Sequence, residues 1–208
     1  RQRQMCIRDR ISAILNITPD HLNRHHTMDC YIKTKEAITT NQTKDEVCVL
    51  NYEDEVLRAF GESAPVHVVW FSSARKLAEG FYLDGEEIFY AHDGNTEKVI
   101  NVNDLNLLGR HNYENVMAAT AMSVNFGVPM EKIVEVLKRF QAVEHRIEYV
   151  TEKRGVRFYN DSKGTNPDAA IQGIRAMNRP TLLIGGGYDK QSTYCLLYTS
   201  PSPRDKRQ

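Results

Sequence analysis

A strand, a helix and a second strand are predicted to follow one another toward the C-terminal end of the chain. Residues 156–159 and 181–184 are short runs rich in apolar side chains. The helix between them is expected to begin at Asn166-Pro167, since proline suits the first helical position, and to run to Met177. A strand–helix–strand connection of this kind joins parallel strands. The sequence therefore predicts an α/β fold.

The preceding sequence also alternates between strand and helix patterns. Predicted strands lie at residues 11–16, 47–50, 66–71 and 147–150, and a β-hairpin at 81–90 turns at Asp84-Gly85. Predicted helices run from Thr27 to about Thr40, over 53–60 and 112–125, and from Pro129 to Phe140. Helical periodicity ends near residues 141–144, where we expect a domain boundary.

The two ends of the chain show neither helical nor strand periodicity. Residues 1–10 and 195–208 resemble translated cloning or adaptor sequence, and we expect them to be non-native tails that take no part in the fold. A pair of disordered natural tails is the alternative.

Composition indicates an ordinary cytoplasmic protein. The 208 residues are 41% hydrophobic and 26% charged with zero formal net charge, so neither a nucleic acid nor a membrane surface is indicated as a partner. No apolar run approaches the length of a membrane span, and no signal sequence opens the chain. The four cysteines have neither metal-ligand spacing nor a disulfide framework, which fits a reducing compartment.

Residues 160–166 (NDSKGTN) mix charged groups and hydroxyls between a predicted strand and a helix N-terminus. Backbone N–H groups and the helix dipole favour an anionic ligand there. Residues 185–190 follow the next predicted strand, and open α/β sheets bind ligands at the carboxyl ends of strands. Ordinary capping and turn residues would also explain the pattern. Lys163 and Lys190 reaching one crevice favours a binding site.

Two further candidates lie near the N-terminal end. His21 follows Thr18-Pro19, a predicted helix start, and could ligate a metal or contact phosphate; a capping or surface histidine is the alternative. Lys35 interrupts the apolar stripe of its predicted helix, where an ammonium group costs desolvation free energy unless it snorkels to water. A lysine carbamate would instead be a carboxylate suited to magnesium.

Two more candidates lie in the middle of the chain. Asn112 and Asn115 are one helical turn apart at a predicted helix start, where two amides could read a purine edge, although capping would explain Asn112 equally well. Arg146, in the run Glu144-His145-Arg146, could clamp a phosphate or form a surface ion pair.

Taken in order, these segments resemble the Mur ligase family. The resemblance covers about residues 11–194 and is carried by residues 16–22, 27–28, 31–35, 109–115, 144–146, 160–166 and 185–190. Within the family, residues 158–166 (FYNDSKGTN) look like the branch that adds D-glutamate. The resemblance implies that residues 11–141 are part of a central ATP-binding domain. Residues 142–194 would begin a Rossmann-like, amino-acid-binding C-terminal domain.

The resemblance also implies an activity. Such enzymes use ATP to convert a carboxylate into an acyl phosphate with release of ADP, and an incoming amino group then displaces phosphate to form an amide. For the D-glutamate-adding branch the substrates are UDP-N-acetylmuramoyl-L-alanine and D-glutamate, in peptidoglycan precursor synthesis. The enzyme is expected to be monomeric.

Each candidate residue gains an implied role. His21 matches a magnesium-ligating position beside the phosphates, and Lys35 matches a carbamylated lysine that helps to hold a second magnesium ion. The other matches are nucleotide contacts (Asn112, Asn115, Arg146 and Asp161) and contacts with the phosphoryl and amino-acid substrates (Lys163, Thr165 and Lys190). His21, Lys35 and Lys163 are the expected catalytic residues.

The sequence also departs from the family pattern. It contains no G-x-x-x-x-G-K-[ST] phosphate loop, and no segment resembles the UDP-binding domain. We therefore expect the chain alone to be inactive, and its interrupted sheets to leave it marginally stable or prone to aggregation. The alternatives are another ATP-dependent amide ligase, such as a folylpolyglutamate synthase, and a non-catalytic nucleotide-binding module.

Overall fold

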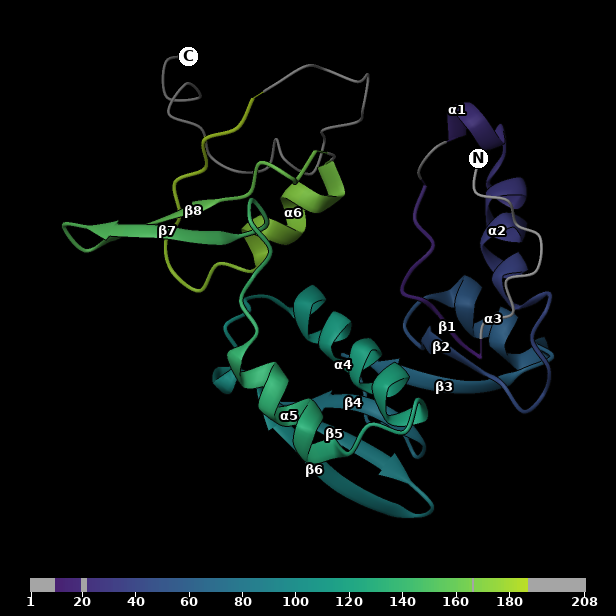
Figure 1. Ribbon diagram of the computed structural model, residues 1–208. Coiled ribbons are helices and arrows are strands. Elements are labelled where there is room, and N and C mark those ends of the chain that lie inside the picture. Colours follow the sequence, from purple (N-terminus) through teal and green to yellow (C-terminus); the bar gives the residue numbers. More distant parts are fainter. Residues whose placement is uncertain (1–9, 20–21, 166, 187–208) are drawn as a thin grey trace. The chain divides into compact units, whose positions relative to one another are not determined.

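The computed structural model describes residues 10–19, 22–165 and 167–186, which divide into two compact units (Figure 1). The first unit comprises the residues up to Leu105 together with Asn112–Phe140. The second comprises Asn106–His111 and the residues from Gln141 onward. The chain therefore passes between the units on both sides of the segment Asn106–His111.

A six-stranded sheet forms the centre of the first unit, with its strands in sequence order. The strands are β1 (Ile11–Ile14), β2 (Val47–Asn51), β3 (His67–Ser72), β4 (Gly80–Asp84), β5 (Glu87–His92) and β6 (Asn95–Asn101). Neighbours from β1 to β4 pair in parallel, whereas β4, β5 and β6 form an antiparallel meander. The predicted hairpin around Asp84-Gly85 is confirmed, and β6 extends it as a strand that the sequence pattern did not predict.

Of the five helices described between β1 and residue 148, four begin within two residues of their predicted starts, whereas the helix predicted to start at Thr18-Pro19 is described only from Leu22. The five helices are α1 (Leu22–His25), α2 (Met28–Glu36), α3 (Glu55–Ser63), α4 (Arg110–Asn125) and α5 (Met130–Arg139), with 3₁₀ turns at Ala37–Thr39 and Val102–Asp104. Thr27 caps α2, since its hydroxyl accepts the N–H of Cys30 at 3.2 Å. The helix predicted to reach Thr40 is α-helical only to Glu36 and then tightens into a 3₁₀ turn.

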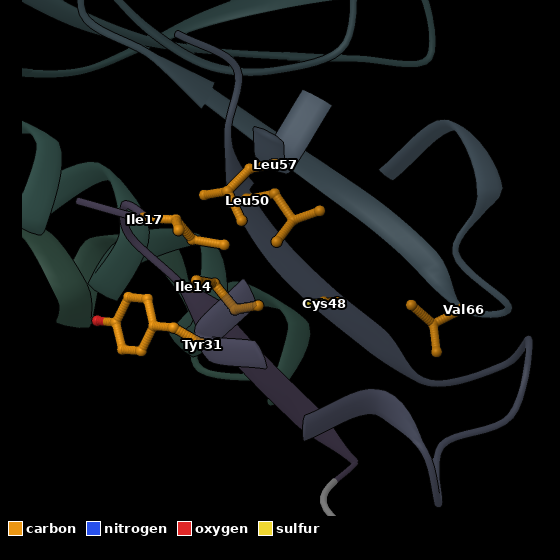
Figure 2. Packing of buried hydrophobic residues seen from close by; sticks show 7 residues of the cluster. All are labelled: Ile14, Ile17, Tyr31, Cys48, Leu50, Leu57 and Val66. Carbon is orange, nitrogen blue, oxygen red and sulfur yellow. The ribbon is translucent and has the colours of Figure 1, made fainter. Parts of the chain in front are cut away.

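One hydrophobic cluster packs α2 and α3 against the first strands of the sheet (Figure 2). Its buried members are Ile14, Ile17, Tyr31, Cys48, Leu50, Leu57 and Val66. All five residues of β2 are buried, because this strand has a neighbour on each side and an apolar face against the helices. The cluster thus anchors the carboxyl ends of β1 and β2, from which polar loops leave the sheet.

The second unit contains a β-hairpin and a helix. The strands β7 (Glu148–Lys153) and β8 (Val156–Asn160) confirm two predicted strands, and α6 (Pro167–Arg175) confirms the helix that follows. The strands pair with each other in antiparallel fashion. They turn at Arg154 and Gly155, both with positive φ, so the connection is local.

The strand predicted at residues 181–184 is not formed. This segment has no regular secondary structure, and Leu182 and Ile184 are 81% and 91% exposed. The prediction of a parallel strand–helix–strand unit here was therefore wrong. An apolar run becomes a strand only when a neighbouring strand accepts its backbone hydrogen bonds. The α/β class stands, because the parallel pairs occur among β1 to β4.

Within the described part of the chain, every helix is too short or too polar to cross a lipid bilayer.

Candidate functional site

The predicted site residues fall in both units. Lys35, Asn112 and Asn115 belong to the first unit, and Arg146, Asp161, Lys163 and Thr165 to the second. His21 and Lys190 lie outside the described residues.

In the second unit, the loop before β7 and the loop after β8 pack against each other. The side-chain nitrogen of Asn160 lies 2.8 Å from Nδ1 of His145, and the N–H of Lys163 donates to the carbonyl of His145 at 3.0 Å. The N–H of Ile147 donates to Oδ1 of Asp161 at 3.2 Å. The structure thus brings together two motifs that sequence analysis had singled out separately.

The carboxylate of Asp161 is held in a close-fitting position. Its own carbonyl accepts the N–H of Gly164 at 2.9 Å, which closes the loop after β8 into a turn. A Cβ atom on Gly164 would lie 2.9 Å from Oδ2 of Asp161, and one on Gly173 of α6 would lie 2.6 Å from it. Both contacts are shorter than a side chain tolerates, so two glycines make room for this carboxylate between the loop and α6.

His111 also belongs to this group, although sequence analysis did not select it. Burial lowers the pKa of His111, the positive charge of Arg146 lowers it further, and the negative charge of Asp161 opposes them. Its ring folds back over Gly109, where an added Cβ would lie 2.9 Å from Cε1. The lowered pKa favours the neutral form of the His111 imidazole. The only sequence signal was its place beside Asn112.

The side chains of Lys163 and Thr165 are exposed, while their backbone is fixed. The N–H of Thr165 donates to the carbonyl of Lys163 at 2.9 Å, and that of Lys163 to His145. An ammonium group and a hydroxyl are therefore presented to solvent from a rigid turn just before α6. This arrangement suits an anionic ligand.

The expectation that Lys35 interrupts a buried stripe was wrong. Lys35 is exposed in the last turn of α2, and its Nζ lies 5.4 Å from the ring centroid of Tyr31. Buried Tyr31 supplies the inward face one turn earlier, and the cation suits the helix C-terminus. Because the ammonium group of Lys35 is exposed, there is no desolvation cost that a carbamate would need to explain. The proposed carbamylation of Lys35 therefore rests on the family resemblance.

Asn112 and Asn115 lie in the first turns of α4. The helix begins at Arg110, so Asn112 is its third residue. The alternative interpretation from sequence, in which Asn112 caps the helix, was therefore wrong. The side-chain nitrogen of Asn115 donates to Oδ1 of Asn112 at 3.5 Å, at the long limit for a hydrogen bond. The two carboxamides therefore share one face of the helix, as the spacing predicted.

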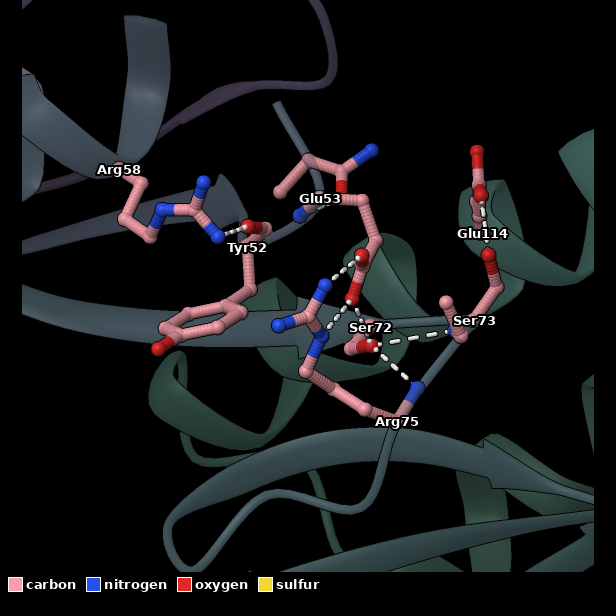
Figure 3. Close-up of polar contacts among 9 residues, drawn as sticks. Tyr52, Glu53, Arg58, Ser72, Ser73, Arg75 and Glu114 are labelled. Atoms are coloured by element: carbon pink, nitrogen blue, oxygen red, sulfur yellow. Dashed lines mark hydrogen bonds and ion pairs between the residues drawn. The ribbon is translucent and has the colours of Figure 1, made fainter. Parts of the chain in front are cut away.

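A polar network that the sequence did not predict lies at the carboxyl ends of β2 and β3 (Figure 3). Arg75 binds Glu53 through two hydrogen bonds of 2.9 and 2.8 Å, and Ser72 donates to the same carboxylate at 2.6 Å. This ion pair raises the pKa of Arg75. The guanidinium groups of Arg58 and Arg75 lie 5.3 and 5.4 Å from the ring centroid of Tyr52.

The same network reaches α4. The hydroxyl of Ser73 donates a hydrogen bond to the carboxylate of Glu114. Ser73 is only 7% exposed, so water competes little for this contact. A loop of the sheet is thereby joined to the helix that carries Asn112 and Asn115.

Across the described residues, no group of three or more His, Cys, Asp or Glu side chains is placed to hold a metal ion. The predicted magnesium site depends on His21, outside the described part of the chain, and on Lys35.

Comparison with known proteins identifies related sequences. The model of the "Mur ligase middle domain" matches residues 1–123. The "UDP-N-acetylmuramoylalanine--D-glutamate ligase" of Lachnospira eligens is 60% identical over 186 residues, which are 89% of this chain and 41% of that protein. The protein of the same name from Lachnoclostridium phytofermentans is 58% identical over 88% of this chain and 40% of its own length. The chain thus spans about 41% of the length of these relatives.

Solved structures share the fold. A crystal structure of MurF from Acinetobacter baumannii superposes with a TM-score of 0.62 at 21% identity, over 81% of this chain and 37% of that one. A pseudomurein peptide ligase type C from Methanothermus fervidus gives a TM-score of 0.56 at 20% identity, over 80% and 40% of the two chains. At these identities the likeness concerns the fold alone.

Proposed function

Because this chain belongs to the Mur ligase family, we propose that it forms part of an ATP-dependent ligase that joins D-glutamate to UDP-N-acetylmuramoyl-L-alanine. The observation that carries this proposal is the 60% identity to a ligase of that name over 89% of the chain. Identity at this level, spread over both units, supports a shared substrate as well as a shared fold. The product is a precursor of peptidoglycan.

The proposed reaction has two steps. The γ-phosphoryl group of ATP passes to the terminal carboxylate of the L-alanine moiety, which gives an acyl phosphate and ADP. The amino group of D-glutamate then attacks the acyl carbon, and the tetrahedral intermediate expels inorganic phosphate and leaves an amide. Both steps bring anions together, so cationic and N–H groups that face the phosphoryl group lower the barrier.

The loops of the second unit support part of this chemistry. Arg146 is exposed and can bind phosphate oxygens through two N–H groups. Lys163 and Thr165 extend from a turn whose backbone is hydrogen-bonded, which limits the entropy lost when they bind a ligand. Asp161 is the proposed nucleotide contact in this unit. Asn112 and Asn115 are the proposed contacts with the base in the first unit.

Magnesium is proposed as the metal that accompanies ATP, with His21 and Lys35 as its protein contacts. When bound, it would neutralise phosphate charge during transfer. Among the described residues no group of three or more His, Cys, Asp or Glu side chains surrounds a metal position, so the proposed contacts rest on the family resemblance. The cytoplasm is the proposed location.

A chimeric enzyme tests the proposal. The portion of the Lachnospira eligens ligase that matches this chain would be replaced by the corresponding residues of this chain. We expect ADP release that requires both UDP-N-acetylmuramoyl-L-alanine and D-glutamate, and no turnover by the 208-residue chain alone. A chimera that folds and binds ATP, yet uses another amino acid or none, would overturn the proposal in favour of another amide ligase or a non-catalytic nucleotide-binding module.

A further inference from the structure

The hydrogen bond between Ser73 and Glu114 joins the sheet to the helix turn that carries Asn112 and Asn115. We infer that Ser73 and Glu114 are positioning residues, which fix the direction in which these two carboxamides meet the purine base. The inference rests on the proposed function, because it concerns the nucleotide of that reaction. Ser73 and Glu114 themselves are not proposed to touch the nucleotide.

Ser73 is held firmly enough to position a partner. The hydroxyl of the preceding Ser72 accepts the N–H groups of Ala74 and Arg75 at 3.2 and 3.1 Å, which closes the chain around Ser73 into a turn. That hydroxyl also donates to Glu53, which in turn binds Arg75 through two hydrogen bonds. The turn is therefore fixed to the end of β2 by a charged pair, as Figure 3 shows.

Glu114 is a suitable partner for this turn. A hydrogen bond to an ionised carboxylate is stronger than one between neutral groups. Glu114 is the fifth residue of α4, just beyond the first turn of the helix. The hydrogen bond from Ser73 to Glu114 therefore fixes how closely the start of α4 approaches the sheet. It also fixes the rotation of α4 about the helix axis.

The rotation decides where the carboxamides point. Each helical residue turns the side-chain direction by about 100°, so Asn112 and Asn115 share a face while Glu114 points away from it. The hydrogen bond 3.5 Å long between the two amides agrees with this shared face. Because Ser73 holds Glu114 on one side of the helix, the amide pair is directed to another side.

The ligand that this arrangement suits is an adenine nucleotide. A carboxamide offers a donor and an acceptor side by side, which matches the adjacent donor and acceptor of adenine. The N7 and O6 atoms of guanine are both acceptors, so a correctly directed amide pair discriminates against it. If α4 could rotate about its axis, the selectivity for adenine over guanine would fall although the protein remained folded.

The test uses the chimeric ligase, with KM and kcat measured for ATP, GTP and D-glutamate. We expect Glu114→Ala and Ser73→Ala to raise the KM for ATP by about tenfold, as for a lost hydrogen bond to a charged group. The preference for ATP over GTP should fall, while the KM for D-glutamate stays the same. Glu114→Gln keeps an oxygen that accepts from Ser73, so it should change the KM for ATP and the preference for ATP over GTP less than Glu114→Ala does.

Glu135→Ala is the matched control. Glu135 is an exposed helical carboxylate of α5 that pairs with Lys132 and Arg139 on the surface, so its loss should leave the ATP preference unchanged. An unsubstituted chimera without ligase activity would overturn the proposed function itself. An active chimera whose ATP-to-GTP preference is the same with Glu114→Ala, or changes equally with Glu135→Ala, would overturn the positioning role. If the Glu114→Ala variant does not fold, the Ser73→Ala variant tests the positioning role by the same comparison of the ATP-to-GTP preference.

Discussion

The carboxylate of Asp54 accepts the backbone N–H of Ile17 at 2.6 Å, across 37 residues of sequence. Its other oxygen accepts the N–H groups of Val56 and Leu57 and so caps α3. One side chain therefore holds the loop after β1 and starts a helix of the next crossover. Asn51 supports the same loop, since its side chain donates to the carbonyl of Leu15 at 3.1 Å.

Replacing Asp54 by alanine should lower the free energy of unfolding by about 2–3 kcal/mol, because a helix cap is lost and the N–H of Ile17 loses its acceptor. Urea denaturation followed by circular dichroism measures the change. Glu131→Ala is the control, since Glu131 is an exposed acidic residue in the first turn of α5. Equal effects of the two substitutions would contradict the assigned role of Asp54.

Gly61 of α3 packs against the indole of Trp70. A Cβ atom there would lie 2.3 Å from Cη2 of Trp70 and 3.1 Å from a methyl carbon of Leu50. We expect Gly61→Ala to destabilise the first unit by about 1–3 kcal/mol through overpacking. Since Trp70 is the single tryptophan, its fluorescence should report the displacement directly. Gly186→Ala, where the added atom meets nothing within 4 Å, should leave both stability and emission unchanged.

Replacing Gly173 by alanine should destabilise the protein, whereas the same change at an exposed helical glycine usually stabilises it. An exposed glycine-to-alanine change in a helix interior stabilises by about 1 kcal/mol. In α6 the added Cβ would instead lie 2.6 Å from Oδ2 of Asp161. We expect Gly173→Ala to lower the melting temperature and, in the chimeric ligase, to raise the KM for ATP. The exposed neighbour Gln172→Ala serves as the comparison; a stabilising Gly173→Ala would show that Asp161 is not confined there.

The pKa of His111 should respond in opposite directions to its two charged neighbours. Burial and the charge of Arg146 lower it from its ordinary value of 6.5, and Asp161 raises it. Arg146→Ala should therefore raise the pKa of His111, and Asp161→Asn should lower it further. The NMR chemical shift of the His111 Cε1–H group, followed against pH, measures both. Shifts of the same sign would contradict the arrangement of the three side chains.

The lowered pKa of His111 also predicts how the stability of the protein depends on pH. Because the pKa of His111 is lower in the folded state than in the unfolded state, protonation favours unfolding. The free energy of unfolding should fall as the pH drops below about 6.5 and level off once the folded state is also protonated. His111→Gln should flatten this part of the pH profile, while His67→Gln, at an exposed position, should not.

Local features were predictable because their causes lie within a few residues. The helix start at Thr27, the turn at Asp84-Gly85 and the strand β2 each follow from short-range geometry or an unbroken apolar run. The family resemblance was likewise contained in short segments in a fixed order, and comparison confirmed it. The roles assigned to His21 and Lys190 remain predictions, since both residues lie outside the described part of the chain.

Contacts between distant segments required the folded chain. Nothing local shows that Asp54 meets Ile17, that Ser73 meets Glu114, or that His111 lies near Asp161. The exposure of Lys35 and of residues 181–184 depends in the same way on where a helix ends and whether a strand finds a neighbour. Periodicity along the chain reports which side of an element prefers burial, whereas the partner on that side is chosen by packing and hydrogen bonding among segments far apart in sequence.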